Sequence, residues 1–315
     1  MANITAARIN NLQSSIELIL GSGSGENGYG QSVSSAPVNN TDDTVDATDM
    51  NNLYADILTA RIHQVGPGDS SIAQVIQNEN IVAENTSSYY LDQVDVVGNR
   101  PAGASEDPDG FKKGIIDFET LMTQVQTDKA LLDDSQSTLE PAISSARTST
   151  WNGLIYHEVA VTFSSADARR FFFNAGGELR ISANNTSAST AKGLDWTTLC
   201  SEVGTVKFSA TSTTSVGGSG SAIGNYGLTP GFKTIYQKIG SGTNQGVYAG
   251  NIYTVKARSD IATRIIFRIE FNDVAQVGNI DNNVDGRLES TLQHKRATGT
   301  VVIQAPSYYN SQTLA

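Results

Sequence analysis

Cysteine is almost missing from this chain of 315 residues, and charged residues are scarce. Cys200 is the single cysteine, which excludes an intramolecular disulfide and a thiolate metal cluster and favours folding in a reducing cytoplasm. Asp, Glu, Lys and Arg make up only 17% of the residues, less than in typical soluble domains. The apolar runs, such as Ile265-Ile266-Phe267, are far shorter than a membrane span, and no pattern of a signal peptide is seen. We therefore expect no association with a membrane.

Positive charge is particularly scarce in the first half of the chain. Residues 1–150 carry 7 Lys and Arg against 21 Asp and Glu, a net charge of −14, whereas residues 151–315 have a net charge of +3. An acidic surface repels phosphate, and neither half shows a basic stripe, so nucleic-acid binding is not expected. Two explanations of the acidic half stay open: solubility of a helical segment, or docking against a basic partner.

Neutral polar residues take the place of charge, with 63 Ser and Thr and 29 Gly. Helical periodicity in the first half predicts helices over 5–20, about 46–65 and about 111–133, and a short one over 71–77. Their apolar stripes are Ile9, Leu12, Ile16 and Ile19; Met50, Leu53, Ile57 and Ala60; and Ile115, Phe118, Met122, Val125 and Leu132. Because each stripe is narrow, we expect an open helical arm or hairpin that buries its stripes against other subunits.

The second half has the two-residue periodicity of half-buried antiparallel strands. Strands are predicted over 155–163, 178–183, 204–210, 232–239, 251–258, 264–271, 286–293 and 299–304. About eight strands joined by Gly, Asn and Ser turns predict a β-sandwich. The expected fold is therefore α+β: an N-terminal helical segment for docking or oligomerisation over residues 1–150, then an antiparallel β-sandwich domain with a C-terminal tail over 151–315.

Two motifs resemble ligand sites. The segment from Gly23 to Gly28 matches the glycine spacing of dinucleotide-binding loops, but a helix precedes it and none follows, so we interpret it as a flexible loop. The segment from Asp281 places oxygen ligands at Asn283 and Asp285 as a calcium loop does, but Leu292 stands where a bidentate Glu is required. A structural cation and an ordinary Asn/Asp/Gly turn are the two interpretations left open.

No pattern typical of catalysis is found. The three histidines, His63, His157 and His294, lack metal-ligand spacing, and Cys200 has no signature of a nucleophile around it. The carboxylate pairs Asp42/Asp43 and Asp133/Asp134 fall in acidic loops or at helix ends, where no apolar pocket would raise a pKa. We predict no catalytic, cofactor-binding or metal-binding residues, and a protein that is not an enzyme.

The most distinctive segment runs from residue 164 to 181. Ser164 with Asp167 is predicted to cap a short helix, and Gly176-Gly177 to end it with positive φ. The three successive phenylalanines, Phe171 to Phe173, present too much apolar surface to remain in water. We expect them to close one end of the sandwich or to form an interface between copies.

This segment is also the centre of a resemblance. Six stretches of the chain, in the expected order, resemble virion structural proteins of tailed bacteriophages, many from marine and cyanobacterial hosts. They are Ile4–Gln13, Met50–Tyr54 running on to His63-Gln64, Trp151–Glu158, Ala168–Ser182, Asp195-Trp196 with Val203–Val206, and Arg296–Gly299 before Pro306. Together they span nearly the whole chain.

The resemblance implies a structural component of the virion outside the major capsid shell: a tail, neck or collar, or fibre-associated protein, made in the host cytoplasm. Its partners would be portal or neck, tail or capsid subunits and further copies of itself in a symmetric assembly. One alternative is a receptor-binding module that grips a host-surface glycan, with Tyr226 or Tyr248 lining a groove. Others are a capsid decoration protein and a depolymerase with two converging carboxylates.

Overall fold

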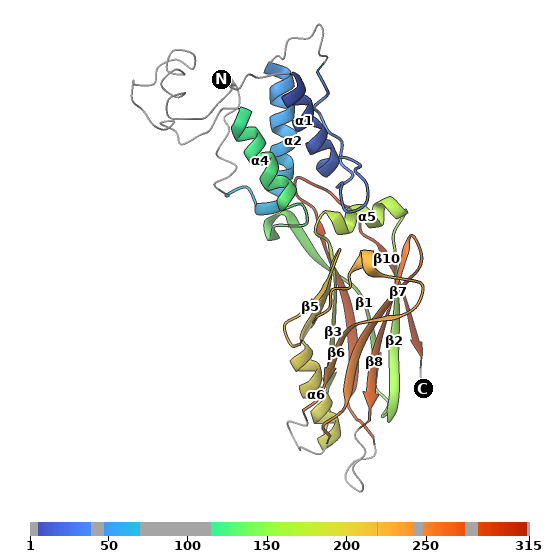
Figure 1. Cartoon of the computed structure of the whole chain (residues 1–315). Coiled ribbons are helices and arrows are strands. Elements are labelled where there is room, and N and C mark those ends of the chain that lie inside the picture. Colours follow the sequence, from blue (N-terminus) through green and yellow to red (C-terminus); the bar gives the residue numbers. More distant parts are fainter. Residues whose placement is uncertain are drawn as a thin grey trace. The chain divides into compact units, whose positions relative to one another are not determined.

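The computed structural model describes residues 6–38, 47–69, 115–218, 220–241, 248–274 and 283–313. The chain divides into two compact units. The helical unit consists of Met1–Thr138, Arg170–Gly176 and Ala297–Ile303, and the sandwich unit of Leu139–Arg169, Gly177–Arg296 and Gln304–Ala315. The α+β class predicted from the sequence is confirmed, with helices first and sheets after them (Figure 1). Each unit is described below by itself.

Among its described residues, the helical unit contains a bundle of three helices: α1 (Ala6–Leu20), α2 (Ala47–Val65) and α4 (Ile115–Thr127). Each helix contacts the other two. Their stripes turn inward and are at most 6% exposed: Ile9, Leu12, Ile16 and Ile19; Met50, Leu53, Ile57 and Ala60; and Phe118, Leu121, Met122 and Val125. Burying a large apolar side chain stabilises the fold by about 1.5–3 kcal/mol.

The expectation of an open arm that needs other subunits to bury its stripes is therefore wrong. Three narrow stripes are sufficient when they face one common interior, as in helix bundles. Polar contacts join the same helices, because Arg8 forms a two-pronged ion pair with Glu119 at 2.7 and 2.8 Å. Gln64 also donates to the backbone oxygen of Val125 at 2.8 Å.

The predicted helix bounds hold at α1 and α2 but not at the end of the third helix. The N–H of Gly21 donates to Glu17 and that of Gly66 to Ile62, so each of these two helices is followed directly by a glycine. Helix α4 ends at Thr127, and Leu132 lies beyond it. The short helix predicted over 71–77 lies outside the described residues.

The sandwich unit has two five-stranded antiparallel sheets. One has the order β1-β9-β3-β4-β5 and the other β10-β2-β8-β7-β6 (Figure 1). The first contains β1 (Ser137–Arg147), β9 (Arg287–Ala297), β3 (Glu178–Thr186), β4 (Thr205–Phe208) and β5 (Thr213–Ser215). The second contains β10 (Ser307–Thr313), β2 (Gly153–Thr162), β8 (Arg264–Asp273), β7 (Ile252–Ile261) and β6 (Lys233–Ile239).

The two sheets share one apolar interior. Phe208 of β4 contacts Phe267 of β8 edge-to-face, with ring centroids 5.2 Å apart, so side chains of opposite sheets meet. Helix α6 (Ala191–Val203) adds the fully buried Trp196, whose ring lies 5.9 Å from that of Phe271 and 5.0 Å from that of Trp151. Aromatic pairs in this geometry stabilise a core beyond the area that they bury.

Seven of the eight predicted strands are present, and one is wrong. Residues 299–304 form no strand; those up to Ile303 belong to the helical unit, and the segment carries only the isolated bridge between Thr298 and Val302. Backbone groups there are bound instead by Gln136, whose Oε1 accepts from Thr300 N at 3.0 Å. Sequence periodicity missed β1, β5, β10 and helix α6.

Helix α5 (Ala166–Asn174) is the predicted short helix, with two corrections. Its cap is Ser165, whose hydroxyl accepts from Ala168 N at 2.9 Å, whereas Ser164 donates to Gln304. Gly176 has the expected positive φ of 75°, but Gly177 does not. Phe172 and Phe173 are fully buried, so their rings lie inside the chain and are unavailable to an interface between copies.

Candidate functional site

The turn around Asp285 was the strongest metal candidate in the sequence, and its carboxylate has other partners. It accepts from Ser189 N at 2.8 Å and Ser189 Oγ at 2.6 Å, and from Thr190 N at 3.2 Å and Thr190 Oγ1 at 2.5 Å. Thr190 is itself the N-cap of α6, since its hydroxyl accepts from Gly193 N at 3.0 Å. Asp281 lies outside the described residues. The geometry favours the turn interpretation, in which Asp285 fastens the start of α6.

The same contacts set the charge of this carboxylate. Desolvation raises the pKa of Asp285, but the hydrogen bonds from Ser189 and Thr190 outweigh it and lower the pKa to about 2. Hydrogen bonds to the ionised form have this effect because they are lost on protonation. Asp285 is therefore ionised throughout the physiological range, as an anchor for backbone amides at the positive end of a helix.

The segment from Gly23 to Gly28, after α1, presents acceptors where a phosphate site would need donors. The Nδ2 of Asn174 donates to the carbonyl oxygens of Gly25, Asn27 and Gly28 at 3.1, 2.9 and 3.2 Å. Arg170 Nη1 donates to the Asn27 oxygen as well, at 2.7 Å. A phosphate loop directs amide N–H groups at its ligand, whereas this loop presents carbonyl oxygens to donors. The segment is also fixed by these bonds, which corrects the expectation of a flexible loop.

The histidines and the cysteine lie in separate buried places. His63 packs against Tyr29 with ring centroids 4.8 Å apart. His157 forms a hydrogen bond between its Nδ1 and Ser290 Oγ, and burial lowers its pKa to about 4, with Arg147 adding to the effect. Burial raises the pKa of Cys200 to about 12, so its thiol is not an activated nucleophile. Within the part of the chain that the structure describes, no group of three or more His, Cys, Asp and Glu residues forms a metal site.

A relay of Tyr308, His294 and Glu140 is the nearest approach to a catalytic arrangement. Tyr308 Oη lies 2.6 Å from His294 Nδ1, and His294 Nε2 lies 2.8 Å from Glu140 Oε2. Such an order of hydroxyl, imidazole and carboxylate occurs in catalytic triads. Here, however, burial raises the pKa of Tyr308, so the phenol stays protonated. Arg296 Nη2 also donates to Glu140 Oε1 at 2.9 Å.

We interpret the relay as a set of hydrogen bonds that holds strands together. It joins β1 and β9 of one sheet to β10 of the other, and β1 lies far from the other two strands in the sequence. Burial lowers the pKa of His294, although Glu140 acts in the opposite direction. No local motif announces such a set, because its members come from three separate strands, and sequence analysis missed it.

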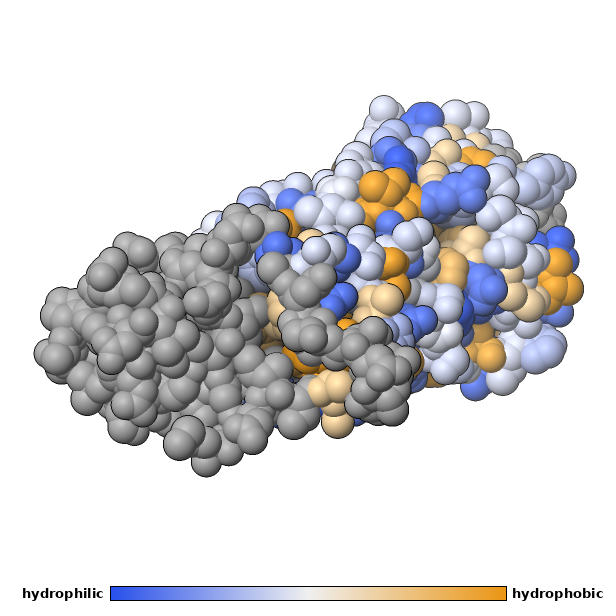
Figure 2. Space-filling view, turned by 90° about the horizontal axis from the view of Figure 1, so that it is seen from above, coloured by the Kyte–Doolittle hydropathy of each residue, from blue (hydrophilic) through white to orange (hydrophobic). Residues whose placement is uncertain are grey.

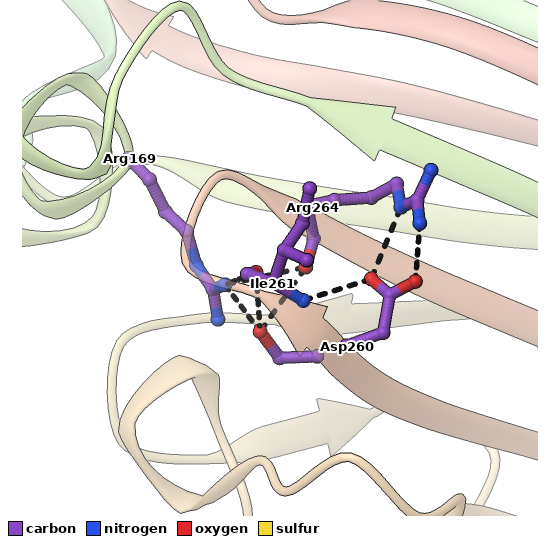
Figure 3. Close-up of polar contacts among 5 residues, drawn as sticks. Arg169, Asp260, Ile261 and Arg264 are labelled. Carbon is purple, nitrogen blue, oxygen red and sulfur yellow. Dashed lines mark hydrogen bonds and ion pairs between the residues drawn. The ribbon is translucent and has the colours of Figure 1, made fainter.

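Arg169 is a second buried hub (Figure 3). It is 7% exposed, its Nε donates to Asn225 Oδ1 at 2.7 Å, and its Nη1 donates to Ser259 Oγ at 2.6 Å. Nη1 also reaches the carbonyl oxygens of Ala262 and Arg264 at 3.2 and 3.3 Å. One guanidinium thus holds the turn between β7 and β8, and burial lowers its pKa from the usual value. Its role is structural.

The remaining sequence candidates are the two carboxylate pairs and the two tyrosines of the glycan alternative. Asp133 Oδ1 accepts from Ser135 N at 2.8 Å and caps the short 3-10 helix η2 (Asp134–Gln136). Asp42 and Asp43 lie outside the described residues. Tyr248 is fully buried and therefore lines no exposed groove, whereas Tyr226 is 38% exposed.

The exposed apolar residues are dispersed. On the face seen in Figure 2, hydrophobic residues form small groups separated by polar ones. The most exposed are Val216 at 90%, Tyr309 at 72%, Val302 at 60% and Ile239 at 58%. Among the described residues, no helix combines the length and apolar character needed to cross a membrane.

Comparisons with family models, curated proteins and solved structures found no match to this chain.

Proposed function

We propose that this protein is a non-enzymatic structural component of a tailed-phage virion, associated with the tail, neck or fibres and present in several copies. The observation that carries the proposal is the ordered resemblance over nearly the whole sequence. The contacts of the described residues support it, because Asp285, Arg169 and Glu140, which bear the charge that chemistry would require, are each bound to the fold itself.

The edges of the two sheets offer the contacts between copies. Strands β10 and β6 are the outer strands of one sheet and β1 and β5 those of the other, so each has an edge that pairs with no described strand. Unpaired strand edges are templates for pairing with another chain. Two of the most exposed apolar side chains, Tyr309 and Ile239, belong to β10 and β6.

Copies are therefore proposed to meet through the sheet edges and not through the helical stripes, which are already buried. Interfaces of this kind require about 1,000 Å² or more of buried surface to be stable. Residues of β10 and of its surroundings would supply part of that area.

Peptide mass spectrometry of density-purified phage particles tests the proposed role. The account expects this chain among the particle proteins, in a copy number that fits a ring or a fibre. Absence from intact particles that carry the gene would contradict it. A glycan array probed with the purified chain separates the receptor-binding alternative, which alone predicts saturable binding to defined sugars.

A further inference from the structure

A lysine and an aspartate meet in the interior of the sandwich unit. Lys192 lies in the first turn of α6 and Asp273 is the last residue of β8. The Nζ of Lys192 lies 2.6 Å from Oδ2 of Asp273, and the two side chains are 2% and 0% exposed. Lysine is almost never buried so completely unless it is paired.

The carboxylate of Asp273 lacks the hydrogen bonds that usually offset the cost of burying an ionised group. Despite the close approach, neither carboxylate oxygen of Asp273 accepts a hydrogen bond of normal geometry from any described residue. Buried charges repay their desolvation only when geometry is good and the remaining lone pairs are satisfied. A cation in the first turn of a helix is also poorly placed, since that end of the helix dipole is positive.

The surroundings exclude water and favour uncharged groups. The ring of Tyr248 lies beneath the amine, 5.8 Å from Nζ to the ring centroid, and Tyr248 is fully buried. Burial raises the pKa of Asp273, although Lys192 acts to lower it. A third carboxyl, Asp195, is 2% exposed and lies three residues along α6, on the same side of the helix as Lys192.

We propose that Lys192 and Asp273 condense into an intramolecular amide bond that fastens α6 to β8. A desolvated lysine amine is a competent nucleophile, and a contact held within van der Waals distance gives the reaction the advantage of proximity. The result would replace two buried charges with one neutral amide.

All atoms of the new amide and of the released water come from Lys192 and Asp273. Transfer of a proton from Nζ to Oδ2 gives a neutral amine and a neutral carboxylic acid. The Nζ lone pair attacks Cγ and forms the N–C bond, and the Cγ–Oδ2 bond breaks with its electron pair on the departing hydroxyl. That hydroxyl takes a second proton from Nζ, which Asp195 can receive and return, and leaves as water. Nothing is oxidised or reduced.

Intact-mass spectrometry of the full chain, purified in the folded state and then denatured, tests the bond. The expected mass is lower than the sequence mass by one water molecule, and a tryptic digest should contain one branched peptide that joins the segments of Lys192 and Asp273. A folded chain that keeps its full sequence mass after prolonged incubation would overturn the proposal.

Variants test whether the bond forms between Lys192 and Asp273. Lys192→Met and Asp273→Ala should both have their full sequence masses, whereas Lys256→Met, which removes a partly exposed lysine paired with Glu270, should still lose one water. Asp195→Asn should accumulate the bond about tenfold more slowly or worse; the wild-type rate would contradict the proton transfer. Loss of water in Lys192→Met would place the reaction elsewhere and overturn the assignment. These masses are independent of the proposed place in a virion.

Discussion

At the scale of single residues, Asp285 and His157 each make the stability of the fold depend on pH, in two separate pH ranges. The folded pKa of Asp285 is lowered to about 2, below the ordinary value of about 3.9 for aspartate. Its stabilising effect is therefore complete above about pH 4 and is lost as the pH falls towards 2. Its hydrogen bonds also restrain the start of α6.

Replacement of Asp285 by Ala is expected to lower the free energy of unfolding by about 1–3 kcal/mol at pH 7, since it leaves the amides and hydroxyls of Ser189 and Thr190 without their acceptor. Urea denaturation at pH 7 and at pH 2.5 measures the effect, which should shrink at the lower pH. Glu26→Gln is the matched control, because that exposed side chain should change stability little. Equal losses at both pH values would count against the assigned role.

His157 should control how stability changes with pH over a less acidic range than Asp285 does. Its folded pKa of about 4 lies below the ordinary value of about 6.5, so the unfolded chain binds the proton more readily. Stability is therefore complete above about pH 6.5 and falls by about 3 kcal/mol as the pH drops to 4. Urea midpoints measured across this range should fall in the wild type and stay flatter in His157→Asn, which cannot titrate. Parallel slopes in the two proteins would refute this.

At the scale of elements, the turn between β7 and β8 depends on one guanidinium. Arg169→Met should lower the free energy of unfolding by about 3–5 kcal/mol or prevent folding, because it leaves the buried acceptor Asn225 Oδ1 without its donor. Arg180→Met, which breaks a surface pair with Glu178, should cost about 1 kcal/mol or less. Hydrogen exchange of residues 259–264 measures the local effect, and protection equal to the wild type in Arg169→Met would contradict it.

Elements whose burial is regular could be predicted from the sequence. Strand β2 alternates cleanly because one side of it faces the interior, and the stripes of α1 and α2 repeat every three or four residues for the same reason. Strand β1 was missed because its side chains are mostly half-exposed and Pro141 interrupts it. Helix α6 was missed because Lys192 and Asp195 are buried polar residues, which blur its apolar stripe.

The candidate sites show the limit of sequence patterns more clearly. The motif at Asp285 could be found from local spacing, but its partners Ser189 and Thr190 lie 96 and 95 residues away. The pair of Lys192 and Asp273 and the relay of His294 and Glu140 join separate elements, so no local pattern reports them. Only the fold brings such residues together.

At the scale of the whole molecule, the account makes the protein a self-supporting building block that joins other copies through strand edges. Tyr309→Asp on β10 should shift the purified chain from oligomer towards monomer, since the change places a charge at the proposed contact. Sedimentation velocity measures the shift, with Tyr226→Asp as the control at another exposed tyrosine. A wild-type chain that is monomeric at all concentrations would contradict the proposed contact through the strand edges.

The central claim, a structural place in the particle, is tested most directly by electron microscopy of intact tailed phages that encode this chain. Gold-labelled antibody raised against the full chain should mark the tail, neck or fibres at symmetry-related positions. Particles that remain unlabelled there, while the antibody detects the chain only as free protein in the infected cell, would contradict the account.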